Sequence, residues 1–353
     1  MKIERIEFEK VEIPRKKMFV IATGSSDRYT GVLVKLYTDG GIVGIGEASP
    51  SRGVTGETPE TVCAVLPEIE KKIKGLHIEE HEKIRERLGG IKGNSAAKAG
   101  VEIALNDAIG KATGMPVAKL LGLYRESITT SITIGIESKE ETLKDAERLL
   151  AEGAKVLKVK IGLDWREDIE RIKAIREKFG YGFRIRVDAN QGYSVKNAIK
   201  VVREIECLEI EFIEQPVKWF DMEGLAEVTR ASPIPVMADE AVHDADDLLR
   251  LARVRACDMV NIKLMKCGGI REAYLIANLA ERLGMECMIG CMSETRVGIS
   301  AGTHAALGIK NICYADLDGH IDLAGDVVKE GGVLTKNGEN TVPLHLPGIG
   351  CLL

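Results

Sequence analysis

The distribution of apolar and polar residues changes near residue 127. Beyond this point, short apolar and β-branched runs alternate with longer stretches in which apolar residues recur every three or four positions. The first pattern is typical of buried strands and the second of amphipathic helices. Their regular alternation predicts parallel βαβ units. The expected strands are "SITIGI", "VLKVKIG", "FRIRVDAN", "IEFIEQPV", "IPVMADE", "MVNIKL", "ECMIGC" and "CYADLD".

Eight strands of this kind favour a closed (β/α)8 barrel in the α/β class. The intervening helices include "KEETLKDAERLLAEG", "REDIERIKAIREKFG" and "REAYLIANLAERLG". An open, doubly wound sheet is the main alternative, because its strands and helices alternate in the same way.

The first 125 residues follow a mixed pattern. "KIERIEFEKVEI" and "GVLVKLYTDGGIVGIGEA" predict antiparallel strands, the second forming a hairpin that turns at Asp39–Gly41. Residues 15–30 show no clear period and contain Gly-Ser-Ser, so a mobile loop is expected there. Helices are expected in "TPETVCAVLPEIEKKIKG" and "SAAKAGVEIALNDAIGKATG".

Charged residues lie at the carboxyl ends of most of the expected barrel strands. In a barrel these ends form one face, where residues from several strands build the active site. A single charge at a strand end is usually a cap or a surface group, but charges in step with the repeat indicate a functional site. They are Lys160, Asp188, Glu214, Asp239, Lys263 and Asp316.

Three of these charges are acids from successive strands. Neighbouring strands lie about 5 Å apart, so Asp188, Glu214 and Asp239 are expected to converge on one small volume. Three unneutralised carboxylates would repel one another there. A hard divalent cation with oxygen ligands removes the repulsion, and Mg²⁺ fits best, although ligand type alone does not separate it from Mn²⁺. Asn190 shares a face with Asp188 and could orient a ligand.

Two lysines are expected on opposite walls of the same site. Lys160 ends the second strand and Lys263 ends the sixth, which places them across the barrel mouth from each other. Two such bases suit the inversion of a stereocentre, because one removes a carbon-bound proton and the other delivers a proton to the opposite face. The pKa of a lysine base must fall from about 10.4 towards 7–8. Lys158, two residues before Lys160 on the same face, would oppose its protonation and could contact a substrate carboxylate.

Composition and charge exclude several classes of protein. The chain has 49 Lys and Arg against 54 Asp and Glu, with a net charge of −5 and no basic run typical of nucleic-acid binding. No apolar segment approaches the roughly 18 residues that a membrane span requires. Eight cysteines include no CxxC pair, which favours free thiols in a reducing compartment over disulfides or zinc. A soluble, cytoplasmic protein that acts on a small molecule is expected.

Several motifs together resemble the enolase superfamily, in particular its muconate-lactonizing subgroup. They are "KVK" at 158–160, "DAN" at 188–190, "EQP" at 214–216, "ADE" at 238–240 and "NIKLMKCGGI" at 261–270. The active sites of this superfamily use a Lys or His base together with Mg²⁺.

The resemblance implies a division of the chain into three parts. These are an α+β capping domain at 1–125, the barrel with the active site at 126–320, and a segment at 321–353 that returns to the cap. It also implies that loops around Ile21–Thr30 and Ser49–Gly56 close over the barrel, and that the protein forms a homo-oligomer.

Within the subgroup, the chain is most similar to dipeptide epimerases of the L-Ala-D/L-Glu type. Asp316 and Asp318 in "YADLDGH" resemble the pair that holds the substrate α-ammonium, and paired carboxylates call for a cationic group. The resemblance further implies substrate contacts from Thr133, Cys291, Met292 and Ser293.

The expected reaction is Mg²⁺-dependent epimerisation of an L,L-dipeptide at its C-terminal residue, by proton transfer between two bases through an enediolate. The alternatives are a lyase such as o-succinylbenzoate synthase or an acid dehydratase, a cycloisomerase, or an N-acyl amino acid racemase. The resemblance implies an arginine near Ile21 that pairs with the Glu side chain in Ala-Glu epimerases, and this position has none here. Arg28 is the candidate to replace it, and a dipeptide with an apolar second residue is the alternative substrate.

Overall fold

The computed structural model describes residues 1–353 and contains an eight-stranded parallel barrel. The strands follow one another around the barrel in sequence order. The ring closes between the first and last strands, where Ser131 N donates to Ala315 O at 3.1 Å and Thr130 bridges to Ala315. The predicted barrel is therefore confirmed. Its strands are β5 (Ile132–Ile134), β6 (Val156–Lys160), β7 (Arg184–Asp188), β8 (Ile210–Glu214), β9 (Val236–Ala238), β10 (Met259–Lys263), β11 (Glu286–Gly290) and β12 (Ile312–Asp316).

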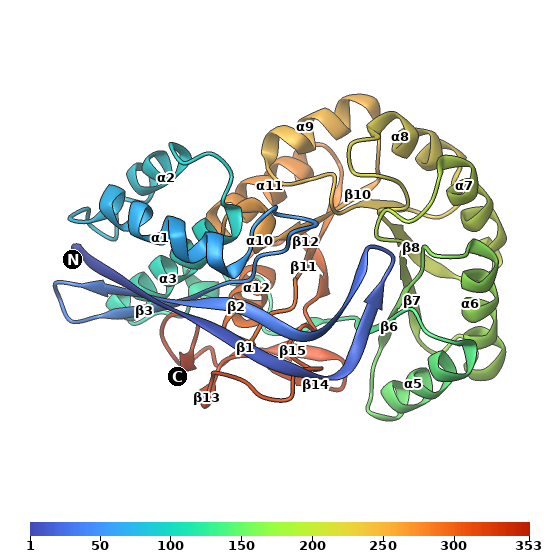
Figure 1. Ribbon diagram of the computed structural model, residues 1–353, viewed down its shortest axis with the longest axis horizontal. Helices are drawn as coiled ribbons and strands as arrows, with labels where there is room; N and C mark the ends of the chain where they lie inside the picture. Colours follow the sequence, from blue (N-terminus) through green and yellow to red (C-terminus); the bar gives the residue numbers. More distant parts are fainter.

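Helices surround the barrel on its outer side (Figure 1). Their apolar faces pack on outward-facing strand residues such as Leu157 and Val159, in one core of buried aliphatic side chains. No helix combines the length and the apolar character that crossing a bilayer requires. The outer helices are α5 (Lys139–Ala151), α6 (Trp165–Phe179), α7 (Val195–Glu204), α8 (Met222–Ala231), α9 (Ala245–Val254), α11 (Ile270–Arg282) and α12 (Arg296–Gly308), with the short α4 (Val117–Leu120), α10 (Leu264–Cys267) and a 3₁₀ turn (Glu206–Leu208).

Near the amino ends of its strands the barrel interior holds apolar side chains packed around the buried Arg186, and near the carboxyl ends it holds charged side chains. Phe212, Met237, Met259 and Met288 form a separate buried cluster from four neighbouring strands. On β6 the inward positions near the carboxyl end are Lys158 and Lys160, both buried. Period-two alternation therefore places both lysines inside the barrel.

The capping domain consists of one antiparallel sheet and three helices. The β2–β3 turn lies at the predicted Asp39–Gly41, where Gly41 takes a positive φ of 78°. Helix α1 begins at a capping box in which Thr58 and Thr61 exchange hydrogen bonds. The elements are β1 (Ile3–Ile21), β2 (Gly24–Thr38), β3 (Val43–Ala48), α1 (Pro59–Ile73), α2 (His81–Gly89) and α3 (Ser95–Thr113).

The prediction of a mobile loop at residues 15–30 is wrong. Strands β1 and β2 continue through this region as a hairpin that reaches over the barrel mouth (Figure 1). Ile21 pairs with Gly24 at its tip. The register shifts between Pro14 and Phe19, where the intervening residues have no partner on β2. This irregularity breaks the two-residue alternation by which a strand is recognised in sequence.

The C-terminal segment returns to the capping domain, as expected for this fold class. Leu323 bridges to Arg15 on β1. Gly348 O accepts at 2.9 Å from Val117 N on α4, directly after the cap. The buried Asp107 of α3 accepts from Ile349 N at 2.8 Å. The segment contains β13 (Glu330–Gly331), β14 (Leu334–Lys336), β15 (Glu339–Thr341) and β16 (Cys351–Leu352), and β15 pairs with β4 (Ile128–Thr129).

Two glutamates of the capping domain bind the N-termini of barrel helices. Glu47 on β3 accepts from Thr295 N and Gly298 N, both at 2.9 Å, where α12 begins. Glu102 on α3 accepts from Ile270 N at 2.6 Å, where α11 begins. Free N–H groups and the helix dipole make these positions favourable for a carboxylate.

Replacing Gly46 by alanine should destabilise the protein by about 1–3 kcal/mol, because β3 packs directly on α3. An added Cβ would lie 2.0 Å from Gly100 O and 2.8 Å from Ala104 N, both rigid backbone atoms. Gly89→Ala is the matched control, since a Cβ there meets nothing within 4 Å. Thermal denaturation of both variants measures the effect, and equal stabilities would contradict close packing of sheet and helix.

Candidate active site

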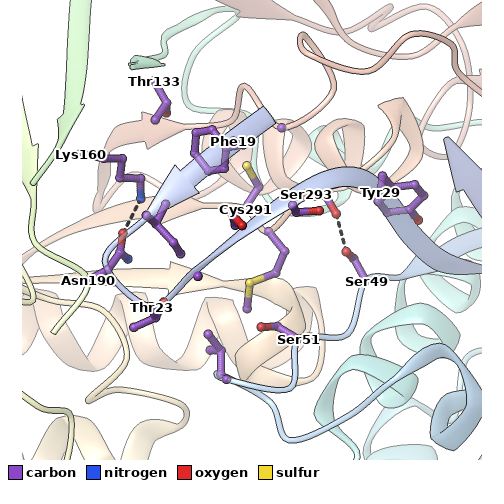
Figure 2. A pocket seen from close by; sticks show the side chains of 18 of the residues that line it. Phe19, Thr23, Tyr29, Ser49, Ser51, Thr133, Lys160, Asn190, Cys291 and Ser293 are labelled. Atoms are coloured by element: carbon purple, nitrogen blue, oxygen red, sulfur yellow. Dashed lines mark hydrogen bonds between the residues drawn. The ribbon is translucent and has the colours of Figure 1, made fainter. Parts of the chain in front are cut away.

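A cavity of about 380 Å³ lies between the barrel mouth and the capping domain (Figure 2). Both segments expected to cover the mouth contribute to its walls, one through the β1–β2 hairpin tip and the other through Ser49–Val54. The floor comes from the carboxyl ends of the barrel strands. Of the predicted site residues, Thr133, Lys158, Lys160, Asn190, Lys263, Cys291, Met292, Ser293, Asp316 and Asp318 line this cavity.

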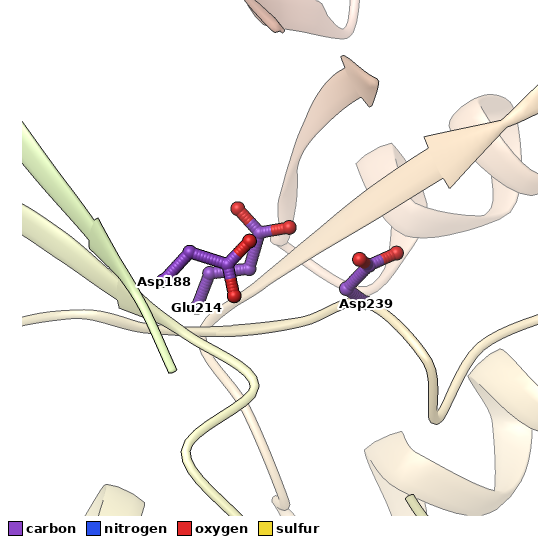
Figure 3. Close-up of side chains that lie close together, drawn as sticks. All are labelled: Asp188, Glu214 and Asp239. Carbon is purple, nitrogen blue, oxygen red and sulfur yellow. The ribbon is translucent and has the colours of Figure 1, made fainter. Parts of the chain in front are cut away.

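The three predicted acids lie together at the carboxyl ends of the barrel strands (Figure 3). Asp188 ends β7, Glu214 ends β8 and Asp239 follows β9. Each is fully buried, at 0% exposure, and one oxygen from each lies within 4.8 Å of the others. Burial and the nearby Asp188 raise the pKa of Glu214 to about 8. An all-oxygen, negatively charged donor set of this size fits a hard divalent cation.

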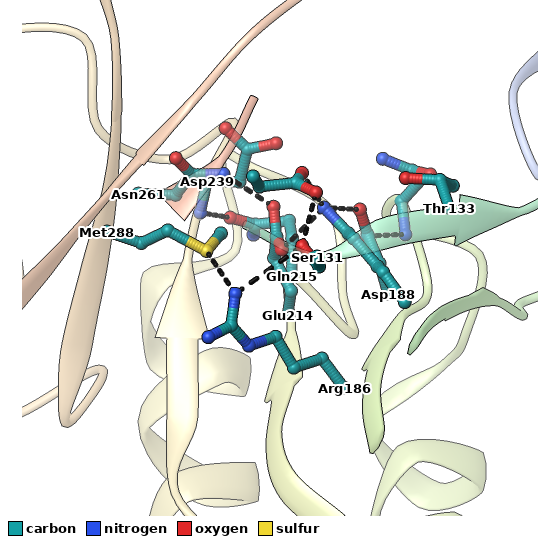
Figure 4. Close-up of polar contacts among 12 residues, drawn as sticks. Ser131, Thr133, Arg186, Asp188, Glu214, Gln215, Asp239, Asn261 and Met288 are labelled. Carbon is teal, nitrogen blue, oxygen red and sulfur yellow. Dashed lines mark hydrogen bonds and ion pairs between the residues drawn. The ribbon is translucent and has the colours of Figure 1, made fainter. Parts of the chain in front are cut away.

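Hydrogen bonds from the surrounding residues orient these acids (Figure 4). Asn261 Nδ2 donates to Glu214 Oε1 at 2.8 Å. Gln215 Oε1 accepts from Asp239 N at 2.8 Å. Lys266 on the short helix α10 is not among the predicted site residues, yet it donates to Asp239 Oδ1 at 2.5 Å. Its signal in the sequence is the second lysine of "KLMK", one helical turn after Lys263.

The two predicted base lysines extend from β6 and β10, four strands apart in the eight-stranded barrel. Lys160 Nζ lies 2.6 Å from Asp188 Oδ2 and 3.0 Å from Asn190 Oδ1 (Figure 2). Lys263 Nζ lies 2.8 Å from Asp239 Oδ2. Burial lowers the pKa of Lys263, but the attraction of the Asp239 and Glu214 carboxylates together outweighs burial and raises the pKa overall.

Lys158 lies deeper than Lys160 and contacts three carboxylates. Its Nζ is 2.6 Å from Asp316 Oδ2, 2.8 Å from Glu214 Oε2 and 3.0 Å from Asp188 Oδ2. These carboxylates overcome the cost of burial and raise its pKa well above the usual range. Lys158 thus connects the acid cluster on β7 and β8 to the Asp316 end of β12.

The two aspartates at the end of β12 differ in their contacts. Asp316 has both oxygens bonded, Oδ2 to Lys158 and Oδ1 to Ser131 Oγ at 2.7 Å. Asp318 accepts from Thr133 N at 2.7 Å through Oδ2 alone. Burial and the nearby Asp316 raise the pKa of Asp318 to about 7. Asp318 therefore retains an oxygen free to bind a ligand.

The segment after β11 meets the capping domain at the cavity wall. Ser49 Oγ donates to the backbone oxygen of Ser293 (Figure 2). Arg15 donates to Ser293 Oγ. Arg28 is exposed, and its guanidinium binds Asp27 and Glu12. Arg15 could not be predicted as a site residue from sequence, because its place in the cavity depends on a hairpin whose sequence pattern predicts a loop.

Known proteins of similar sequence and structure span almost the entire chain. The L-Ala-D/L-Glu epimerase of Clostridium acetobutylicum is 43% identical over 99% of this chain and 98% of its own. The dipeptide epimerase of Enterococcus faecalis V583, solved with Mg and L-Leu-L-Tyr, superposes with a TM-score of 0.97 at 38% identity, with full coverage of both chains. The L-Ala-D/L-Glu epimerase of Bacillus subtilis, solved with bound substrate, gives a TM-score of 0.97 at 37% identity, covering 100% of this chain and 99% of its own.

Family models match both parts of the chain. Residues 5–122 match the mandelate racemase/muconate lactonizing enzyme N-terminal domain, and residues 141–353 match the enolase C-terminal domain-like family. Together with the relatives of high identity and full coverage, these matches place the chain in the enolase superfamily, as a member of the mandelate racemase/muconate lactonizing enzyme family.

Proposed function

We propose that this isomerase epimerises the C-terminal residue of an L,L-dipeptide. The observation that carries the proposal is the placement of two buried lysines on opposite sides of one cavity, with an acid cluster beside them and Asp318 at another wall. Relatives described as epimerases of L-Ala-D/L-Glu and of other dipeptides support this substrate class.

Asp188, Glu214 and Asp239 are assigned to hold one Mg²⁺, the ion present with dipeptide in the E. faecalis structure. When bound, the ion stabilises negative charge on a substrate carboxylate as a Lewis acid. Lys266 and Asn261 keep two of these acids in place.

Lys160 and Lys263 are assigned the two proton transfers. The neutral amine of one removes the α-proton, and the electron pair of the broken C–H bond moves into the substrate carboxylate to give an enediolate. The ammonium of the other then donates a proton to the opposite face of the same carbon. One proton leaves and one arrives, so the configuration is inverted without a change in composition.

Positive charge near the acids is required for this assignment, because the Asp239 and Glu214 carboxylates together raise the pKa of Lys263 despite its burial. Lys158 already provides one such charge. Asn190 is assigned to position Lys160, whose Nζ it contacts at 3.0 Å.

Asp318 is assigned as a binding site for the α-ammonium of the substrate, with Asp316 completing the negative wall. Thr133 holds Asp318 in place through its backbone N–H. Cys291, Met292 and Ser293 are assigned to contact the first residue, because they line the cavity after β11. A dianionic substrate, as a cycloisomerase or succinylbenzoate synthase requires, would be repelled by these carboxylates.

An apolar side chain is proposed for the second residue of the dipeptide. The hairpin tip contributes Ile21 to the cavity, and Val54 comes from the opposite segment. Arg28, the arginine nearest the tip, is already bound to Glu12 and Asp27.

The experiment that tests the function is incubation of the purified protein with Mg²⁺ and single L,L-dipeptides in D2O, followed by mass spectrometry and chiral analysis. We expect a gain of one mass unit at the second residue with formation of the L,D product, faster for Ala-Leu and Ala-Phe than for Ala-Glu. Labelling of N-succinyl amino acids in place of dipeptides would identify an N-acyl amino acid racemase. Faster turnover of Ala-Glu would contradict the apolar preference while leaving the epimerase intact.

Replacing Asp318 by asparagine should raise KM for dipeptides about 10- to 100-fold, the usual effect of losing a hydrogen bond to a charged group. The pH dependence should change as well. The ammonium is bound by the carboxylate form, so kcat/KM of the wild type should rise with pH up to about 7 and then level, following the raised pKa of Asp318. This rise of kcat/KM with pH should be absent in Asp318→Asn. If the rise persists in the variant, a group other than Asp318 causes it.

A further inference from the structure

The cavity contains an arginine that has no carboxylate partner. Arg15 lies on β1 and lines the cavity together with Asp318 and Ser293. Its one side-chain hydrogen bond goes from Nη2 to Ser293 Oγ. The Nε atom is buried and has no partner at all. Buried N–H groups of arginine are normally satisfied, so an acceptor for them is expected from a ligand.

The surroundings fix this guanidinium in place without neutralising it. The Phe19 ring lies against it, with its centroid 4.9 Å from Cζ. Asp318 and Asp322 are near enough to favour the positive charge, yet neither forms an ion pair with it. A rigid planar cation with free N–H groups is well suited to bind a carboxylate through two hydrogen bonds.

The position of Arg15 identifies the part of the substrate that it meets. On the proposed function, the acid cluster and the two lysines hold the second residue, and Asp318 holds the α-ammonium of the first. Arg15 lies on the Asp318 side, against Ser293 in the wall assigned to the first residue. The side chain of the first residue therefore extends towards Arg15.

We propose that Arg15 is a specificity-determining residue that binds a carboxylate side chain on the first residue of the dipeptide. An acidic first residue is favoured, and a cationic one is disfavoured by repulsion from the guanidinium. This inference rests on the proposed function and extends it to the substrate side chain.

The test compares kcat/KM for L-Glu-L-Ala, L-Gln-L-Ala, L-Lys-L-Ala and the reversed L-Ala-L-Glu in wild type and Arg15→Gln. We expect wild type to prefer Glu-Ala over Gln-Ala and Lys-Ala. In Arg15→Gln, kcat/KM for Glu-Ala should fall about 10- to 100-fold, mainly through KM, while Gln-Ala changes little. Arg15→Lys should restore part of the preference, because the charge is kept but the paired hydrogen bonds are lost.

Arg5→Gln is the matched control. Arg5 lies on the same strand and also packs over an aromatic ring, Tyr37 at 3.6 Å, but it does not line the cavity. Arg5→Gln should leave kcat/KM for all four dipeptides unchanged. Equal losses on every substrate in Arg15→Gln would show a purely structural role, and a selective loss on Ala-Glu would assign Arg15 to the second residue. Either result overturns the proposal, whereas the absence of any epimerisation by wild type would refute the proposed function itself.

Discussion

Replacing Lys263 by alanine should reduce epimerisation by orders of magnitude while leaving exchange of the α-proton intact on one face of the substrate. If Lys160 and Lys263 serve opposite faces of the substrate, each single variant keeps one base. That base can still exchange the α-proton of one epimer with solvent, although inversion requires both. We therefore expect epimerisation to fall by about 10²–10⁴-fold in Lys160→Ala and in Lys263→Ala. In D2O, each variant should label only one of the L,L and L,D forms, and the two variants should label opposite forms.

Lys144→Ala is the control for the lysine substitutions, because this residue is exposed on α5 and pairs only with Glu141. It should epimerise and label like the wild type. A lyase or cycloisomerase would behave differently, with one lysine variant inactive and the other only slowed. Loss of labelling of both epimers in both variants would contradict the division of the two faces.

Replacing Glu214 by glutamine should remove turnover and the stabilising effect of Mg²⁺ together. The three buried carboxylates lie within 4.8 Å of one another, and the substitution removes one negative charge from the centre of this set. We expect EDTA to inactivate the wild type and Mg²⁺ to restore it. Mg²⁺ at 100 times its Kd should stabilise the wild type by about 2.7 kcal/mol. Glu214→Gln should show no such shift in thermal unfolding.

Glu223 is exposed on α8 and serves as the control. In Glu223→Gln, Mg²⁺ should still restore activity after EDTA and still raise the melting temperature. A wild-type protein whose melting temperature and activity are unaffected by EDTA and Mg²⁺ would contradict the assignment of a cation to this cluster. Titration with Mn²⁺ in the same assay compares the two ions, which the oxygen ligands accept alike.

The barrel and the central site could be predicted from sequence because both depend on local periodicity. Each strand carries its own polar residue at the carboxyl end, so the topology of the barrel brings Asp188, Glu214 and Asp239 together without further information. The lysine positions on β6 and β10 follow from the same strand count. These predictions required only the order of the strands and the side to which alternate residues point.

The remaining features depend on contacts between distant segments. The pairing of Lys158 with Asp316 joins β6 to β12 across the barrel interior, and no local pattern encodes it. The hairpin over the barrel mouth is concealed by its register shift, so the place of Arg15 in the cavity could not be derived. The difference between Asp316 and Asp318 arises from neighbours on β5 and β6, although the two residues are almost adjacent in sequence.

The two glutamates that bind barrel helices have a consequence for how such enzymes diversify. Glu47 and Glu102 belong to the capping domain, yet they complete the N-termini of α12 and α11 in the barrel. A capping domain taken from a relative would need carboxylates at the positions of Glu47 and Glu102. Without them, the N–H groups at the starts of α12 and α11 would lose their acceptors. New specificity is therefore more accessible by point substitution within the existing cap than by exchange of the whole domain.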